Sequence, residues 1–320
     1  MLPLLAAFAA LLAGILPGGP GVAFAEAPFG TTGRRLDVQV NPPRGGEPAG
    51  QWYVVVWSLN RPDVDVVSRF DDLTPRTSRG AGLSLAVDDK RVRGIMDTRD
   101  LPAPRGKLAT VVLRNNIMPG DRAWEGSRDG IRFDVPLRIL ESEQQGNAVS
   151  YIAATFILSS ARSKRSFWLQ VQFFDTRGRR SARELAAPPH KAFDRLLCSP
   201  TRSTNLPILS ATAGSPSRFV SFLPGSPDLV SQAGPTGTFR FVISKENLRA
   251  MLSTLGNSND WCTNGTDFAP DDLDLIELRQ ASVMVETHFG TIPAGTRSDS
   301  IFSRLHFEAQ VPTVIHRRSP

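Results

Sequence analysis

Two predicted strands near the C-terminus, 281–289 and 301–311, carry the residue types best suited to chemistry. In both, apolar residues alternate with polar or charged ones. Successive side chains of a strand point to opposite faces, so each stretch has one apolar face for a core and one polar face. Carboxylates and imidazoles can exchange protons with a substrate, and an arginine can hold an anionic group. The candidate catalytic residues are Glu286, His288, Arg304, His306 and Glu308.

If the two strands pair as a hairpin, the register decides what their polar faces can do. In one register Glu286 faces Arg304, an ordinary charge pair that contributes a few tenths of a kcal/mol. A slide of two residues per strand keeps the same faces together but places Glu286 opposite Glu308 and His288 opposite His306. Two carboxylates that share a site can hold one raised pKa and act as acid and base. The sequence leaves both registers open.

A further strand, predicted at 167–174, could add aromatic and amide groups to this polar face. Its alternation places Trp168, Gln170 and Gln172 on the side away from the core. Sugars are typically bound by aromatic platforms together with a few polar anchors. The alternative is an ordinary solvated outer face of an antiparallel sheet. The candidate ligand-binding residues are Trp168, Gln170, Gln172, Glu286, His288, Arg304 and His306.

The order of elements predicts an all-β fold: an antiparallel β-sandwich of jelly-roll type with one short inserted helix. The sequence spreads 26 Gly and 25 Pro between short apolar runs, which favours many short strands. Ser244 is placed to cap the inserted helix, Lys245 to Leu255, which ends at Gly256. A second short helix is a candidate at 191–197. The strand order and aromatic content resemble those of jelly-roll carbohydrate-binding modules, and no motif names a family.

The sequence patterns of two strands in the middle of the chain predict where each strand lies in its sheet. In 130–140, apolar residues alternate cleanly and Pro136 falls on the outward face, which predicts an edge strand or a bulge. The stretch 149–158 is almost continuously apolar, which predicts a central strand buried on both faces. The expected division is a signal peptide at 1–25, a flexible segment at 26–50, an N-terminal β region at 51–140, a larger sandwich at 141–315 and a tail at 316–320.

The N-terminus predicts export. Leu2 to Leu16 is almost wholly apolar, and Ala23-Phe24-Ala25 offers a small-x-small cleavage site. A bacterial protein, secreted or periplasmic and without a later transmembrane segment, is therefore expected. An oxidising compartment favours a disulfide between the only two cysteines, Cys198 and Cys262.

Charge and motifs narrow the function classes. The net charge is +6 and most of the 37 basic residues are arginine, which indicates either the amino-acid bias of a GC-rich genome or, as the alternative, an anionic partner. Acidic residues lie among them, so no nucleic-acid stripe is evident and no nucleic-acid partner is expected. Nucleotide, hydrolase and metal fingerprints are absent, so no cofactor or metal is expected. The acidic Asp271–Asp274 run predicts a solvated turn, with a calcium site as the alternative.

Three functions remain open from the sequence. The first is a secreted protein that binds a polysaccharide or other glycan, anionic if charged. The second is a lyase or hydrolase for an anionic polysaccharide, with Arg304 and either Gln170 or Gln172 holding a carboxylate and His288 or His306 as the base. A tyrosine acid is poorly supplied, because Tyr151 lies in an apolar strand. The third is a non-catalytic envelope structural or assembly protein.

Overall fold

The structure is a computed structural model. It describes residues 36–40, 50–58, 64–67, 82–99, 108–117, 120–146, 148–177, 194–200, 205–258, 262–263, 267–289 and 301–318. The predicted signal peptide at 1–25 lies outside these residues. Within them, no helix has the length and apolar character needed to cross a bilayer.

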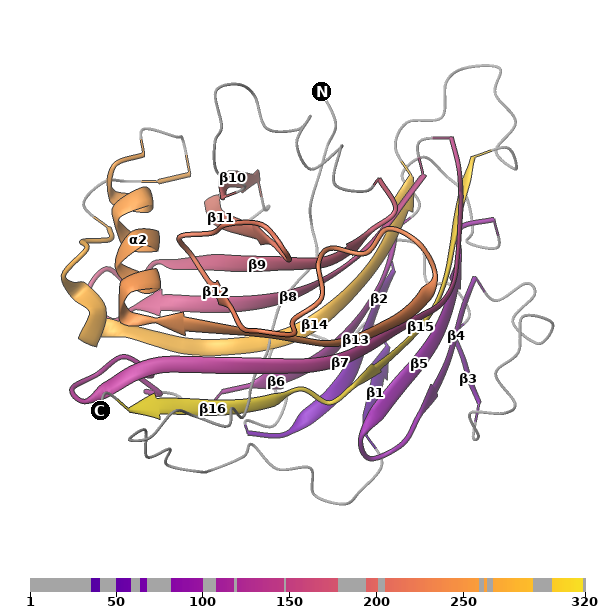
Figure 1. Cartoon of the computed structure of the whole chain (residues 1–320), viewed down its shortest axis with the longest axis horizontal. Coiled ribbons are helices and arrows are strands. Elements are labelled where there is room, and N and C mark those ends of the chain that lie inside the picture. The colour runs from indigo at the N-terminus through magenta and orange to yellow at the C-terminus, as the bar shows by residue number, and fades with distance from the viewer. Residues whose placement is uncertain are drawn as a thin grey trace.

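The described chain forms a β-sandwich of two eight-stranded sheets, as predicted (Figure 1). Sheet A contains, in spatial order, β1 (Asp37–Val40), β2 (Trp52–Ser58), β6 (Leu108–Asn116), β14 (Ile276–Phe289), β8 (Ala148–Ser160), β9 (Ser166–Asp175), β11 (Asn205–Thr212) and β10 (Arg195–Pro200). Sheet B contains β12 (Ser221–Phe222), β13 (Gly234–Ser244), β7 (Arg128–Gln145), β15 (Phe302–Gln310), β5 (Arg91–Asp97), β4 (Leu83–Val87) and β3 (Val64–Val67), with β16 (Thr313–Arg318) paired to β7.

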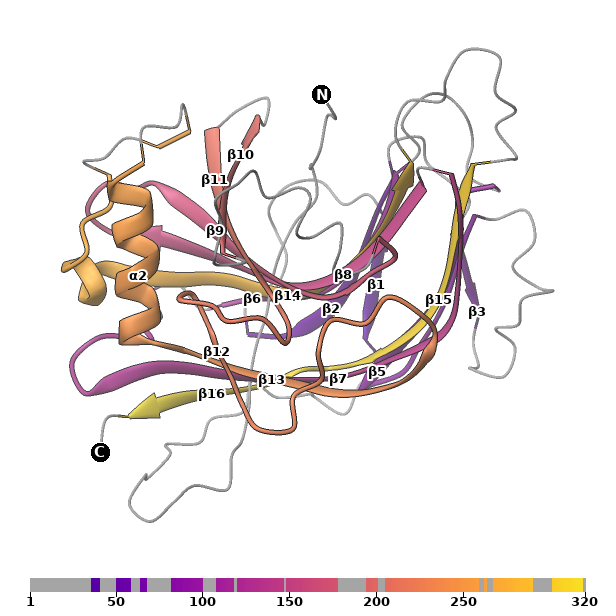
Figure 2. The same ribbon diagram turned by 45° about the horizontal axis from the view of Figure 1, so that its top comes forward.

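Most neighbouring strands are antiparallel, and three pairs are parallel: β1 with β2, β3 with β4, and β9 with β11. The two sheets curve in the same direction. Figure 2 shows β8, β9 and β14 of sheet A on the concave side and β7 and β15 of sheet B on the convex side. The jelly-roll sandwich therefore has a concave outer face on sheet A and a convex outer face on sheet B.

Phenylalanines from both sheets fill the centre of the core. The ring centroids of Phe173 (sheet A) and Phe239 (sheet B) lie 4.5 Å apart, and those of Phe133 and Phe241 lie 4.9 Å apart. The edge of Phe156 meets the ring of Phe133 at 5.6 Å. Burying one such side chain stabilises the fold by roughly 1.5–3 kcal/mol. This packing confirms the inward faces predicted for 130–140 and 167–174.

Strand β8 is buried on both faces, as its continuous apolar sequence predicted. Ile152 and Phe156 belong to the main core between the sheets. Val149 and Tyr151 belong to a second buried cluster on the opposite side of sheet A, with Val112 and Met284. A strand that is covered on both sides has no need for polar alternation.

Of the two alternatives predicted for Pro136, the edge strand is wrong, because β7 is a central strand with neighbours on both sides. Register irregularities of β7 against β13 and β15 do lie close to it, at 137–141. Pro136 pairs with Thr238 of β13 on one side. On the other side it lies where β15 ends and β16 begins: Ala309 pairs with Leu137, and Thr313 pairs with Asp134. The interruption between β15 and β16 allows a residue without an N–H group to lie inside a sheet.

The hairpin prediction for 281–289 and 301–311 is also wrong. Strand β14 pairs with β6 and β8 in sheet A, whereas β15 pairs with β5 and β7 in sheet B. Both inward faces are as predicted: Val283 and Val285, and Leu305 and Phe307, lie in the core. The two strands pack face to face across the core, so their polar faces point to opposite sides of the molecule.

Strands from both predicted β regions alternate within the two sheets. In sheet A, β2 and β6 lie beside β14, and in sheet B, β4 and β5 lie beside β15. The expected boundary at 140/141 falls inside β7 (Arg128–Gln145). The described parts of 51–140 and 141–315 therefore share one hydrophobic core.

The inserted helix is confirmed as α2, Lys245–Gly256. Its first turn has a capping box: the Ser244 hydroxyl accepts from the Asn247 backbone N–H at 3.2 Å, and the Asn247 amide oxygen accepts from the Ser244 N–H at 3.0 Å. The second helical prediction, 191–197, is wrong for 195–197, which begin β10. The tail prediction is wrong for 316–318, which lie in β16.

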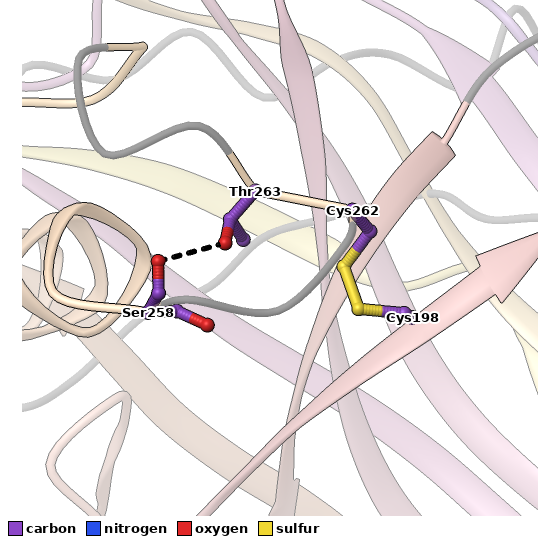
Figure 3. The surroundings of a disulfide bond; sticks show 4 residues. All are labelled: Cys198, Ser258, Cys262 and Thr263. Atoms are coloured by element: carbon purple, nitrogen blue, oxygen red, sulfur yellow. Dashed lines mark hydrogen bonds between the residues drawn. A yellow bond between two sulfur atoms is a disulfide. The ribbon is translucent and has the colours of Figure 1, made fainter.

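The predicted disulfide is present (Figure 3). Cys198 in β10 is bonded to Cys262, with the two Cα atoms 5.5 Å apart. Nearby, the Thr263 hydroxyl donates to the backbone oxygen of Ser258 at 3.1 Å. The bond ties the edge strand of sheet A to the segment that follows α2.

Candidate functional site

One face of sheet A points away from the core, and we call it the sheet A outer face. Strand alternation and the pairing registers place polar side chains of six strands on this face: β2, β6, β14, β8, β9 and β11. Its members are Tyr53, Thr110, Arg114, Tyr151, Thr155, Trp168, Gln170, Gln172, Ser210, Gln280, Ser282 and Glu286. This face lies on the concave side of the sandwich (Figure 2).

Glu286 is the most perturbed group on this face. It pairs with Tyr151 of β8 on one side and with Thr110 of β6 on the other. Its exposed fraction is only 2%. Burial disfavours the charged form and raises the pKa of Glu286 to about 8, although a hydrogen bond from Tyr151 partly opposes the shift. Glu286 is therefore mostly a neutral acid at pH 7.

Two polar atoms in this group have no hydrogen-bond partner among the described residues. They are Oε2 of Glu286 and Oγ1 of Thr110. These residues are Cα partners on neighbouring strands, so the two atoms belong to one small region of the sheet A outer face. Buried polar atoms usually have partners, and exceptions call for an explanation such as a functional role.

Tyr151 connects Glu286 to an ion pair on the next strand. It pairs with Glu286 on β14 and with Asp175 on β9. Arg177 binds Asp175 with two parallel contacts, Nε to Oδ1 at 2.8 Å and Nη2 to Oδ2 at 2.6 Å. Burial, and to a smaller extent the neighbouring Glu286, raise the pKa of Tyr151 well above its ordinary value, so its hydroxyl stays a proton donor.

A second cation lies near this ion pair. Arg195 of β10 is half-buried, and burial together with the charge of Arg177 lowers its pKa, while Asp175 opposes that shift. Arg195 pairs with Ser210 of β11, which in turn pairs with Gln170 of β9. The β9–β10 side of the face is therefore positively charged.

A second polar row crosses the same face further along the strands. The guanidinium of Arg114 lies 5.9 Å from the ring centroid of Tyr53. The Gln280 amide contacts Asn116 at 3.0 Å, and with its amide oriented the other way its oxygen accepts from Arg114. The hydroxyls of Thr155 and Ser282 lie 3.4 Å apart. This row offers hydroxyl, amide and guanidinium groups, which suit a polyhydroxylated ligand.

The structure brings together four of the predicted site residues. Trp168, Gln170, Gln172 and Glu286 all lie on the sheet A outer face. The backbone position of His288, two residues beyond Glu286, is on the same side of β14, and its side chain lies outside the described set. Trp168 packs with Leu206 and Ile208, and its side chain is 4% exposed.

The other three predicted residues lie elsewhere. Arg304, His306 and Glu308 are on the outer face of sheet B, on the convex side, so they cannot share a site with Glu286. Two of them are held in ion pairs there. Arg93 binds Oε2 of Glu308 at 2.6 Å, and Arg304 binds Oε1 of Glu141 at 2.9 Å. Burial and two flanking arginines lower the pKa of His306 to about 4, so this imidazole is neutral at pH 7.

Sequence reasoning missed Tyr151, Thr110 and Arg177. Tyr151, which the sequence made a poor candidate acid because it lies in an apolar strand, lies opposite Glu286. A signal was available in the sequence. A tyrosine in a strand that is buried on both faces needs a polar neighbour for its hydroxyl, and that neighbour is a candidate for function.

The acidic run 271–274 forms the short 3-10 helix η2 (Asp272–Leu275). Asp272 makes an ion pair with Arg162, and Oδ1 of Asp274 accepts from the Gly126 N–H at 3.2 Å. Among the described residues, no group of His, Cys, Asp or Glu side chains is arranged to hold a metal ion.

Comparison with known proteins adds little beyond the fold. No protein-family model matches the sequence, and a search of curated proteins finds no match either. Among solved structures, a family 11 xylanase from Neocallimastix patriciarum is similar at 9% identity and a TM-score of 0.33, over 74% of this chain and 97% of that one. A cellulase derived from that of Rhodothermus marinus is similar at 10% identity and a TM-score of 0.29, over 71% and 85%.

The adhesin domain of Epf from Streptococcus pyogenes is also similar, at 9% identity and a TM-score of 0.26, over 84% of this chain and 60% of that one. Identities and scores this low carry no argument about ligand or activity. Function therefore has to be argued from the site itself.

Proposed function

We propose that this protein binds a polysaccharide or other glycan through the sheet A outer face. One observation carries the proposal: a whole face of an eight-stranded sheet, directed away from the core, carries aromatic, amide, hydroxyl and guanidinium groups. Apolar side chains, among them Val112, Met284 and Ile208, lie between these groups, and most side chains of the face are buried. Glycans present both C–H faces and hydroxyls, which this mixture suits.

Each group has a distinct role in such binding. Trp168 contributes an aromatic ring that is 4% exposed and packs with Leu206 and Ile208. Gln170 and Gln172, on the same face of β9, can each donate to and accept from sugar hydroxyls. The three residues lie at alternate positions along β9, so they would contact successive parts of an extended chain.

The charge of the face favours an anionic glycan. Arg114, Arg177 and Arg195 are directed to it or border it, and Asp175 balances one of these charges. Glu286 adds little negative charge at pH 7, because burial raises its pKa to about 8. Arginine forks match carboxylate and sulfate groups in geometry as well as in charge.

Export fits this function. The apolar N-terminal stretch with its cleavage site suits a secreted or periplasmic protein, which meets polysaccharides outside the cytoplasm. The Cys198–Cys262 disulfide is consistent with an oxidising compartment.

Enzymatic action on an anionic polysaccharide is the second candidate. The contact between Tyr151 and Glu286 favours it, because two adjacent proton-carrying groups on a binding face can serve as acid and base. The histidine and arginine of β15 no longer enter this candidate, since they lie on the other sheet.

The test is affinity gel electrophoresis of the purified protein in gels that contain polygalacturonate, alginate, xylan or cellulose derivatives. We expect retardation by an anionic polymer, weakened about tenfold in Gln170→Ala and Gln172→Ala, each of which removes about one good hydrogen bond. The matched control is Gln310→Ala, an exposed glutamine on sheet B. No retardation by any polymer, with a protein captured in a pull-down, would instead support an envelope assembly role.

A further inference from the structure

Solvent reaches the sheet A outer face unevenly. Gln170 in the middle of β9 is 4% exposed, and Thr155 beside it on β8 is fully buried. Three polar side chains near the edge strand β10 are instead half-buried: Gln172 on β9, Arg177 just beyond the end of β9, and Arg195 at the start of β10. A ligand that arrives from solvent can therefore contact the face at this edge.

Strand pairing places Arg195 on the same face as the glutamines of β9. Arg195 pairs with Ser210 of β11, and Ser210 pairs with Gln170. Leu197, the next residue of β10 on this side, packs with the apolar cluster around β9 and β11 on this face. The charge of Arg177 acts on Arg195, so the two guanidiniums are neighbours. We define the cationic corner as the four residues Gln172, Asp175, Arg177 and Arg195.

Arg177 is already committed to the one carboxylate of the cationic corner. Its backbone N–H and its Nε donate to Oδ1 of Asp175 at 2.9 and 2.8 Å, and its Nη2 donates to Oδ2 at 2.6 Å. Asp175 is 2% exposed, so this ion pair is shielded from water. A ligand anion would have to compete with Asp175 for the fork of Arg177, which makes Arg177 a poor recognition group.

Arg195 is in a different electrostatic position. Burial and the charge of Arg177 lower its pKa, and Asp175 opposes that shift. The four residues of the cationic corner include two guanidiniums and one carboxylate, so a further negative charge there would stabilise the charged form of Arg195. A guanidinium presents its N–H groups as a planar fork, which matches a carboxylate or sulfate group in geometry.

Arg114, the half-buried arginine of β6, lies too far away to join the cationic corner. Five steps between neighbouring strands separate β10 from β6 in sheet A, which is roughly 24 Å along the sheet at about 4.8 Å per step. The buried residues Thr155 and Ser282 lie between the two arginines. One anionic group can therefore contact Arg195 or Arg114, but not both.

The backbone of β10 is fixed on both sides of Arg195. Asp194, the preceding residue, accepts at Oδ2 from the Arg218 backbone N–H at 2.6 Å. Three residues after Arg195, Cys198 is bonded to Cys262 (Figure 3). An arginine on a strand that is held in this way loses less conformational entropy on binding than one on a free loop.

We propose that Arg195 recognises, through its guanidinium fork, an anionic group of the bound glycan, a carboxylate or a sulfate, and gives the site its preference for anionic over neutral glycans. The proposal rests on the glycan-binding function proposed above for the same face. Gln172, the half-buried amide of the cationic corner, can donate to or accept from a sugar hydroxyl beside that anionic group. Arg195 is thus a specificity-determining residue of the face.

The test is titration calorimetry of the purified protein, at low salt, with two matched pairs of oligosaccharides. Oligogalacturonate and its methyl ester differ in a carboxylate, and carrageenan and agarose oligosaccharides differ in sulfate. We expect the wild type to bind the charged member of one pair about tenfold more tightly than the neutral member, as one charge-assisted hydrogen-bonded contact provides. The pair that shows the preference identifies the anionic group.

Two variants and one control assign the preference to Arg195. Arg195→Gln should weaken binding of the charged member only, so that the preference disappears. Arg195→Lys keeps the charge but not the fork, and the preference should be reduced. Arg91→Gln removes the same charge from the outer face of sheet B, where Arg91 pairs with Asp88, and should keep the full preference.

The outcomes separate the two proposals. Equal wild-type binding of charged and neutral members would overturn this inference and leave glycan binding standing. So would a preference that survives in Arg195→Gln, or an equal loss of affinity for both members of a pair in that variant. No binding of any oligosaccharide by the wild type would remove the proposed function and this inference together. If circular dichroism shows that Arg195→Gln has not folded, Arg195→Lys decides, and an unaltered preference there would overturn the inference.

Discussion

Glu286 on β14 lies directly opposite Tyr151 on β8, and both strands belong to the sheet on the concave side of the sandwich (Figure 2). The two strands are neighbours in sheet A, although their residues are separated by 135 positions along the chain. Burial holds the carboxyl neutral at pH 7, and the phenol donates to it. A buried acid with a proton donor beside it is costly as a structural element and useful as a reactive one.

Stability should fall as the pH rises from about 4.5 to about 8 because of Glu286. Its pKa is raised in the folded state, so across this window the folded protein holds a proton that the unfolded chain has released. This difference in proton binding lowers the free energy of unfolding by at most about 1.4 kcal/mol per pH unit, which amounts to a few kcal/mol over the whole window. Glu286→Gln should remove this slope and have the higher melting temperature at pH 8.5. A wild-type slope in the variant, measured by calorimetry from pH 5 to 9, would contradict the assignment.

His306 should make the fold sensitive to acid. Its pKa is lowered to about 4 by burial and by Arg93 and Arg304, with Glu308 opposing the shift. In the unfolded chain the histidine is protonated below about pH 6.5, whereas in the folded protein it is protonated only below about pH 4. Stability is therefore lost as the pH falls from about 6.5 to about 4. The ring is partly exposed, so solvent screening reduces the effect. Thermal melts at pH 4.5 and 7 should show a smaller loss in His306→Gln than in the wild type; an equal loss would refute the explanation.

Reduction of the Cys198–Cys262 disulfide should destabilise the fold. The bond closes a loop with a sequence separation of 64. On the chain-entropy model a loop of that length contributes about 4 kcal/mol. Urea unfolding of the wild type with and without a reducing agent measures the loss. The double variant Cys198→Ser, Cys262→Ser provides the control, because it should show no further response to reduction.

A hydroxyl cluster should couple the two sheets. The Ser150 hydroxyl of sheet A lies 2.6 Å from the hydroxyl of Ser303 of sheet B and 2.6 Å from that of Thr287. All three residues are fully buried, so losing one partner leaves the others unsatisfied. Ser150→Ala and Ser303→Ala should each cost about 1–3 kcal/mol. In the double variant the costs should not add, and a double-mutant cycle that shows strict additivity would mean that the contact contributes nothing.

The sequence predicted local features well, because strand alternation and helix capping depend on residues that are close together in the sequence. The inward faces of 130–140 and 167–174, the cap at Ser244 and the disulfide all follow from such patterns. The parallel pairs and the strand order do not, since they depend on contacts between distant segments.

The candidate site was predicted only in part for the same reason. Glu286 and Trp168 were placed on polar faces correctly, but which faces meet depends on the sheet to which each strand belongs. Strands β14 and β15 are successive in the chain, which favoured a hairpin. Two strands in opposite sheets bury their apolar faces in the core just as well as the two strands of a hairpin do. The partner of Glu286 was therefore Tyr151, from a strand that looked purely apolar.

The central claim is that the sheet A outer face receives a glycan, and intrinsic tryptophan fluorescence tests it most directly. Purified wild type and Trp168→Phe are titrated with polygalacturonate, alginate and xylan; phenylalanine keeps the packing on Leu206 and Ile208. We predict a saturable change in wild-type emission with an anionic polymer and its loss in Trp168→Phe. A change that persists unaltered in the variant, or no change with any polymer, would contradict the claim.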